Sequence, residues 1–131
     1  MIKFLSLDNI IKIHNIIIKE FGGLQGNSER LELFESSIQH IKNNDYYPHF
    51  HEKIAHLMFC CIKFHPFIDG NKRTSIAIAK IFMQINNYFC MQKIEVQLEN
   101  IAVFIAENTF SEKQLADFFK ENLQKNKNKN K

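Results

Sequence analysis

The sequence predicts an all-α protein, a compact single-domain bundle of about six helices that occupies residues 1–123. Apolar residues recur at intervals of three and four along several segments, which is the spacing of one face of a helix. Capping residues, glycines and prolines stand between these segments. The chain has 131 residues, 45% of them hydrophobic, which is enough for one core and too little for two ordinary domains.

Two helices separated by a glycine-rich loop are predicted in the N-terminal part. The first runs from Ser6, a favourable N-cap, to Phe21, and Gly22 is its stop signal. Its apolar face consists of Ile10, Ile13, Ile17 and Phe21. The loop, residues 22–28, holds three of the four glycines, which indicates turns that a side chain would obstruct. Ser28 then opens a second helix with Leu31, Phe34, Ile38 and Ile41 on its apolar face.

Two further helices flank a polar loop in the middle of the chain. The first, Glu52–Phe64, ends directly before His65 and Pro66. Because proline disfavours helical geometry in the residue before it, His65 should lie just past the helix end, in a loop on a rigid support. The next helix begins at Asn71 and is apolar on nearly every face between residues 76 and 85, which is typical of a central, surrounded helix.

The C-terminal part is expected to contain two helices and a tail. Residues 86–92 break the pattern, and Glu95–Val96 reads as a short extended piece. Helices follow at Leu98–Ala106 and Ser111–Leu123, the latter opened by a capping box of Ser111 and Gln114. Residues 124–131 alternate asparagine and lysine without an apolar residue, so we expect a disordered basic tail.

Composition excludes several function classes. Removing the four lysines of the tail from the formal charge of +3 leaves the body at −1, which is unsuited to clamping nucleic acid. The three cysteines, two of them adjacent, suggest neither a disulfide framework nor a Cys-pair zinc site and fit a reducing cytoplasm. No apolar run approaches the length needed to span a membrane, and no signal peptide is visible.

Ionisable groups concentrate in the ten residues that join the third and fourth helices, His65-Pro66-Phe67-Ile68-Asp69-Gly70-Asn71-Lys72-Arg73-Thr74. A glycine-containing loop that leads into a helix N-terminus offers unpaired N–H groups and the positive end of the helix dipole to a phosphate, and Gly70 lets the backbone approach it. Lys72 and Arg73 are unfavourable at that end unless an anion neutralises both. Arg73 can also hold two phosphate oxygens at once. The segment therefore predicts a site for a nucleotide phosphate.

The remaining side chains of this segment complete a reaction site. Asp69 offers a hard oxygen ligand for Mg²⁺ beside the phosphates, and Asn71 could orient a phosphate or cap the helix. His65 can remove a proton from an attacking hydroxyl near neutral pH, and Phe67 is expected to anchor the loop in the core. Taken singly, each has an ordinary structural interpretation, such as an N-cap or a solvated charge. Only the occurrence of all these residues together in one segment is specific for a reaction site.

This segment resembles the signature of the Fic/Doc family, His-x-Phe-x-Asp/Glu-Gly-Asn-Gly/Lys-Arg, and matches every fixed position. The resemblance implies an all-helical domain with His65 as base and Asp69 on Mg²⁺. It also implies that Gly70, Asn71, Lys72 and Arg73 surround the phosphates of ATP. Lys72 stands where nucleotidylyl-transferring members have glycine, and with the early Gly22–Gly26 loop it resembles the death-on-curing toxin branch.

That branch is thought to bind the nucleotide reversed and to deliver its γ-phosphate. The resemblance therefore favours a protein kinase that acts on a hydroxyl of elongation factor Tu, as the toxin of a toxin-antitoxin system. The best-known toxin of the branch has alanine where this chain has Gly70, so transfer of AMP or another nucleoside monophosphate to a protein hydroxyl remains an alternative. A catalytically silent helical module that binds a partner is a second alternative.

Similarity also bears on partners. Family members are often silenced by a helix bearing Ser/Thr-x-x-x-Glu-Gly/Asn, and Asp117–Asn122 approaches this motif but begins with aspartate. We interpret it as an ordinary amphipathic helix with Leu115, Phe118 and Phe119. Without an internal inhibitor, the resemblance implies a small prevent-host-death-type antitoxin supplied in trans.

Two other signals favour no further function. His49, His51 and His56 form a histidine-rich stretch, but His51 and His56 are five residues apart and do not share a helical face, so we assign them no transition metal. A DNA-binding helical regulator would need a basic recognition helix, and the helix after Asn71 is apolar instead.

Overall fold

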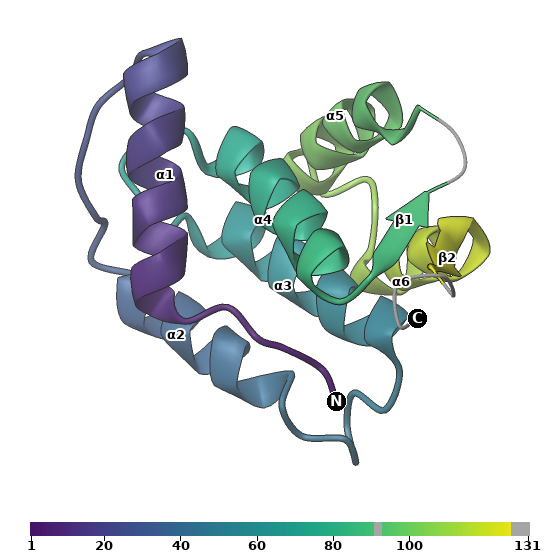
Figure 1. The fold of residues 1–131 in the computed structure, drawn as a ribbon. Coiled ribbons are helices and arrows are strands. Elements are labelled where there is room, and N and C mark those ends of the chain that lie inside the picture. The colour runs from purple at the N-terminus through teal and green to yellow at the C-terminus, as the bar shows by residue number, and fades with distance from the viewer. Residues whose placement is uncertain (91–92, 127–131) are drawn as a thin grey trace.

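The computed structural model confirms an all-helical fold. It describes residues 1–90 and 93–126 (Figure 1). Within these residues the elements are α1 (Leu7–Phe21), α2 (Leu31–His40), α3 (Phe50–Phe64), α4 (Asn71–Ile85), β1 (Tyr88–Cys90), α5 (Ile94–Ala106), α6 (Glu112–Asn122) and β2 (Leu123–Lys125). No helix in this described part is both long and apolar enough to cross a membrane.

The central helix is α3. It packs against α2, α4, α5 and α6, and ten of its fifteen residues are buried (Figure 1). The prediction that the helix starting at Asn71 is surrounded on nearly every face is therefore wrong. Only seven of the fifteen residues of α4 are buried, and several apolar side chains on its flanks, namely Ile76, Ala77, Ile81 and Ile85, are half-buried. Helix α4 is covered by α3, α1, α5 and β1, and its exposed residues are Lys72, Arg73, Lys80 and Gln84.

Local capping explains where several helices begin. The Ser6 hydroxyl accepts a hydrogen bond from the backbone of Asn9, whose side chain in turn accepts from the backbone of Ser6, as in a capping box. Ser111 and Gln114 form the predicted capping box of α6. At α3, His49 is the N-cap residue and the Glu52 carboxylate accepts from its N–H, so this helix starts two residues before the predicted boundary.

Two predicted elements differ from the structure. The second helix begins at Leu31 and not at Ser28, because the Ser28 hydroxyl binds the backbone of Arg30 and of the His65 loop. Glu95 and Val96 are not extended but lie in the first turn of α5. Leu98, Ala102 and Ile105 of that helix are buried at helical spacing, and this packing outweighs the local preference for an extended backbone.

The predicted disordered tail also begins too early. Gln124 and Lys125 belong to β2, which pairs antiparallel with β1 in the register Tyr88↔Lys125, Phe89↔Gln124 and Cys90↔Leu123. The Lys125 ammonium lies over the Tyr88 ring, 4.5 Å from its centroid, and donates to the carbonyl of Asn86. Asn126 follows β2 and donates its N–H to the carbonyl of Asn87. Residues 127–131 of the predicted tail lie outside the described residues.

Candidate active site

The end of α3 presents His65 as the sequence predicted. The helix stops at Phe64, and His65 adopts left-handed backbone angles, φ 48° and ψ 61°, before the buried Pro66. Its side chain is exposed to solvent. A left-handed conformation is uncommon for residues with a side chain, so the surrounding loop must hold it in place.

Asn71 fastens this loop to the start of α4. Its side-chain oxygen accepts from the backbone N–H of Phe67 at 3.0 Å, and its amide nitrogen donates to the carbonyl of Phe67 at 2.8 Å. The same nitrogen lies 3.3 Å from Nδ1 of His65. An amide nitrogen only donates, so in this arrangement the neutral His65 ring accepts at Nδ1 and carries its proton on Nε2. The Asn71 side chain therefore orients the loop and the imidazole, and a phosphate can meet only its backbone N–H.

His14 on α1, which the sequence analysis missed, also holds the motif loop in place. The side chain is 1% exposed, and its ring stacks on the ring of Phe67 with centroids 3.9 Å apart. Its Nε2 donates to the carbonyl of Asp69 at 2.7 Å. The only signal in the sequence is a polar residue beside an otherwise apolar stripe, which gives no indication of a partner 55 residues away. Phe67, 1% exposed, lies in the core as predicted.

The Asp69 carboxylate joins the motif to the glycine-rich loop. One oxygen accepts from the backbone of Leu24 at 3.1 Å and the other from that of Gly70 at 2.8 Å. These two hydrogen bonds hold the pKa of Asp69 below its ordinary value, so it is an anion near neutral pH. Gly23 makes the approach possible, because a Cβ there would lie 2.8 Å from a carboxylate oxygen.

The glycine-rich loop runs alongside the motif as a short antiparallel pair. Asn27 and Phe67 form a β-bridge, Ile68 donates to the carbonyl of Gly26, and Ser28 donates to the carbonyl of Pro66. This pairing satisfies the backbone of the segment between the helices and leaves the side chains of His65 and Asp69 on the exposed side.

The N-terminus of α4 has the features expected of a phosphate cradle. Gly70 is its N-cap in a left-handed conformation, φ 75°, and the first helical hydrogen bond runs from the N–H of Thr74 to the Gly70 carbonyl. The N–H groups of residues 71–73 precede that bond and have no partner within the helix. A Cβ on Gly70 would approach Ile18 to 3.1 Å, so glycine is favoured here by both conformation and space.

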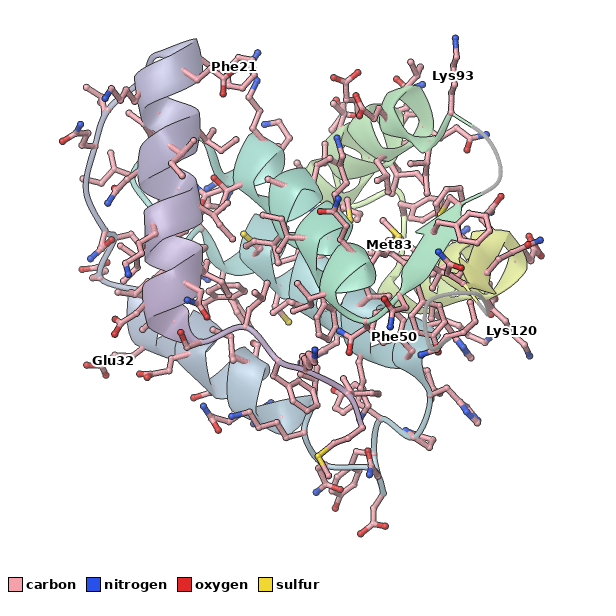
Figure 2. The ribbon with its side chains drawn as sticks, viewed as in Figure 1. Phe21, Glu32, Phe50, Met83, Lys93 and Lys120 are labelled. Atoms are coloured by element: carbon pink, nitrogen blue, oxygen red, sulfur yellow. The ribbon has the colours of Figure 1, made fainter. Side chains whose placement is uncertain are left out.

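The structure places the two cations in different hollows. Lys72 lines a small one of about 110 Å³ together with His65, Asp69, Gly70 and Asn71. Arg73 lines a separate groove of about 220 Å³ between α1, α4 and α5, where its guanidinium lies over the ring of Phe21, 4.4 Å from the centroid. Figure 2 shows Phe21 at the C-terminal end of α1. Enclosed ligand pockets usually measure roughly 300–1,000 Å³, so the small hollow has room for a phosphate group but not for a whole nucleotide.

The fold and this site together define a helical domain with an imidazole presented beside an anion-receptive helix start. A model of the Fic/DOC family matches residues 4–83, which is more than half of the chain and includes α1, the glycine-rich loop and the whole His65–Thr74 motif. The chain belongs to the Fic/DOC family. Members of this family are protein-modifying transferases that typically use a nucleotide cosubstrate, usually with Mg²⁺. No curated protein matches the chain.

Proposed function

We propose that this protein is a kinase-type member of the family, which transfers the γ-phosphate of ATP to a hydroxyl of a translation protein, with elongation factor Tu as the first candidate. One observation carries the choice: Lys72 lines the same hollow as His65 and Asp69, whereas Arg73 lines another. Lys72 stands at the position where nucleotidylyl-transferring members have glycine. Its ammonium group occupies space that a second phosphate would need. It also offers a positive charge to a terminal phosphate beside the imidazole.

The residues of the site have separate roles in this reaction. The acceptor oxygen attacks the γ-phosphorus, the bond from that phosphorus to the β–γ bridging oxygen breaks, ADP leaves, and the hydroxyl proton passes to His65. The N–H groups at the start of α4 and the Lys72 ammonium stabilise the charge on the transferred group. Because Asn71 faces Nδ1, an acceptor hydroxyl either replaces the amide there or meets Nε2 after the ring proton has moved to Nδ1.

Asp69 fits the expected role in binding Mg²⁺. Its carboxylate is exposed and anionic, and each oxygen accepts only one backbone hydrogen bond, which leaves lone pairs for one hard cation. Magnesium is commonly held by one or two carboxylates together with substrate phosphates and waters. When bound, the ion would neutralise phosphate charge and favour departure of ADP.

Transfer of a nucleoside monophosphate is the second candidate. The glycine at position 70 favours it, since the best-known toxin of the death-on-curing branch has alanine there. The open surface beside Arg73 also favours it, because a nucleotide can extend from the helix start across Phe21. In that case the α-phosphorus would occupy the place beside His65.

Incubation of the purified protein with elongation factor Tu, Mg²⁺ and ATP labelled at either the α- or the γ-phosphate separates these candidates. We expect acceptor label from γ alone. Label from α would replace kinase by nucleotidylyl transfer. No label from either, with this acceptor or with a translation extract, would support a silent binding module instead.

Lys72→Gly is the sharpest variant for this experiment, with Lys72→Ala as its matched control. If the ammonium excludes a second phosphate, the glycine variant should lose γ-transfer and gain α-transfer, while the alanine variant, which also lacks the charge, should lose γ-transfer. Position 72 is exposed in the first helical turn, so either substitution should affect folding by about 1 kcal/mol at most. Unchanged γ-transfer in both variants would remove Lys72 from the mechanism.

We further propose that the reaction takes place in the cytoplasm and is restrained by a small prevent-host-death-type antitoxin. The support comes from the likeness to the toxin branch and from α6, where Leu115 and Phe119 are buried as in an ordinary amphipathic helix. Expression of the chain alone in bacteria should arrest growth, expression of His65→Asn should not, and a small reading frame beside the gene should relieve the arrest. Equal growth with the active protein and the variant would contradict a toxin role.

A further inference from the structure

A compact group of metal-ligating side chains lies away from the motif, where α3 meets the first turn of α6. It consists of His56 and Cys60 on α3 and Glu112 on α6. His56 and Cys60 precede His65 by nine and five residues, about 14 Å and 8 Å along the helix axis. His56 and Cys60 are 9% and 4% exposed. The sequence analysis assigned no metal to His56 because His51, five residues before it, does not share its helical face. Cys60, four residues after His56, does share that face.

The three side chains converge on one point. Nδ1 of His56 lies 2.9 Å from a carboxylate oxygen of Glu112 and 3.7 Å from the sulfur of Cys60. The hydroxyl oxygen of Tyr47 lies 3.2 Å from the same nitrogen. One ligand atom from each of His56, Cys60 and Glu112 lies within 4.8 Å of the others. They come from two helices that are far apart in sequence, so the packing of α6 on α3 creates the group.

These distances and donor types fit a zinc ion. Zn–N bonds of about 2.0 Å and Zn–S bonds of about 2.3 Å place the nitrogen and sulfur of a tetrahedral site about 3.5 Å apart, close to the 3.7 Å observed. The nitrogen and the carboxylate oxygen would need to separate from 2.9 Å to about 3.3 Å, a small movement for a side chain on the first turn of α6. A mixed nitrogen, sulfur and oxygen set favours Zn²⁺ over Mg²⁺ or Ca²⁺, which prefer oxygen alone.

Solvent can also reach this point. A wide surface hollow of about 930 Å³ is lined by Tyr47, Glu112 and Lys120, the last of which is labelled in Figure 2. The group can therefore be reached from solvent without unfolding the core.

We propose that His56, Cys60 and Glu112 bind one Zn²⁺ ion that ties α6 to α3, with a fourth position open to the hollow beside Tyr47. Binding displaces the proton of the Cys60 thiol, and it changes no oxidation state. Its effect is to stabilise the contact between α3, which the family model matches, and α6, which lies beyond the matched residues. The site does not depend on the transferase reaction.

Cobalt is a direct probe for this site, because tetrahedral Co²⁺ has strong visible bands and a thiolate ligand adds a charge-transfer band in the near ultraviolet. We expect reduced, metal-stripped protein to bind one equivalent of Co²⁺ with both signatures and to lose them when Zn²⁺ is added. Zn²⁺ should also raise the midpoint of thermal unfolding. A folded protein that shows no thiolate band at saturating Co²⁺ would overturn the proposal.

Matched variants locate the ligands. Cys60→Ser should abolish the thiolate band, while Cys90→Ser, which changes the half-buried cysteine at the end of β1, should retain it. Glu112→Gln keeps the shape of the side chain and should weaken Co²⁺ binding by more than the roughly 10-fold that loss of an outer-shell partner costs. The double variant His49→Ala/His51→Ala should keep the band. Circular dichroism identifies any variant that fails to fold, and loss of the band only in the double variant would mean adventitious surface binding.

Discussion

His14 and Asn71 hold the motif loop from opposite sides, and neither is a group that the proposed chemistry would change. Asn71 binds both backbone groups of Phe67 and faces His65, while His14 supports Phe67 and the Asp69 carbonyl from α1. The left-handed backbone of His65 persists because these contacts fix the residues that follow it. At the scale of single residues, the reactive imidazole is exposed and the residues that position it are buried.

His65→Asn removes the imidazole and keeps a residue that tolerates left-handed backbone angles. We expect transfer to fall by about 100-fold or more, the usual contribution of a general base, with little change in thermal unfolding. Radiolabel transfer and a melting curve on the same preparation measure both. Retention of full activity would exclude His65 as the base.

His14→Phe should keep the stack on Phe67 but lose the hydrogen bond to the Asp69 carbonyl. We expect a loss of about 1 kcal/mol in the free energy of unfolding, measured with urea. Because the loop would shift beside the reacting groups, kcat should fall while KM for ATP changes little. A variant with reduced stability but unchanged kcat would show that His14 serves the fold alone.

Asn71→Ala leaves the buried N–H of Phe67 without its acceptor. An unpaired buried donor costs about 1–3 kcal/mol, so we expect a clear shift in the urea midpoint. The matched control is Asn122→Ala. It removes a side-chain amide that donates a hydrogen bond to the carbonyl of Phe118 within its own helix. Equal effects of the two substitutions would contradict the special role of Asn71.

At the scale of elements, the glycine-rich loop and the motif loop form one unit. The β-bridge of Asn27 with Phe67 and the Asp69 carboxylate connect the chain after α1 to the chain before α4. Gly23 allows this contact because it leaves space for the carboxylate. The geometry of the active site therefore depends on the packing of α1 against α4 as well as on the motif.

Acid should weaken this connection. Hydrogen bonds from Leu24 and Gly70 lower the folded-state pKa of Asp69 below 3.8, so its contribution to stability is complete above about pH 4 and is lost as the pH falls through the lowered value. Carboxyl NMR should show Asp69 titrating below 3.8. In Asp69→Asn, stability near neutral pH should be reduced, and the difference from wild type should vanish in acid. A midpoint at or above 3.8 would refute the two hydrogen bonds.

At the scale of the whole molecule, sequence patterns predicted what is local and missed what depends on tertiary contact. The helices, the end of α3 before His65 and the start of α4 at Asn71 follow from periodicity, proline and capping. The contact of His14 with Asp69 spans 55 residues and leaves no local signal. Pairing of Gln124 and Lys125 with β1 was missed for the same reason, because a polar stretch gives no indication of its partner strand.

The family match covers α1 to α4 and ends at Met83, so the motif and all its positioning residues lie within it. The C-terminal helices, α5 and α6, complete the core through Leu98, Leu115 and Phe119. They also carry the proposed zinc ligand Glu112 and both acidic residues that line the Arg73 groove, Glu95 and Glu99. The N-terminal part thus holds the reactive groups, and the C-terminal part covers the other side of α3 and α4.

The central claim is that the start of α4 receives an anionic cosubstrate within reach of His65. Amide NMR of the nitrogen-labelled protein during titration with ATP and Mg²⁺ tests it without knowledge of the acceptor. We predict that the largest saturable shifts occur at the backbone amides of residues 70–73 and at the His65 ring. No saturable shift there, or shifts confined to the wide hollow of Tyr47 and Lys120, would contradict the account.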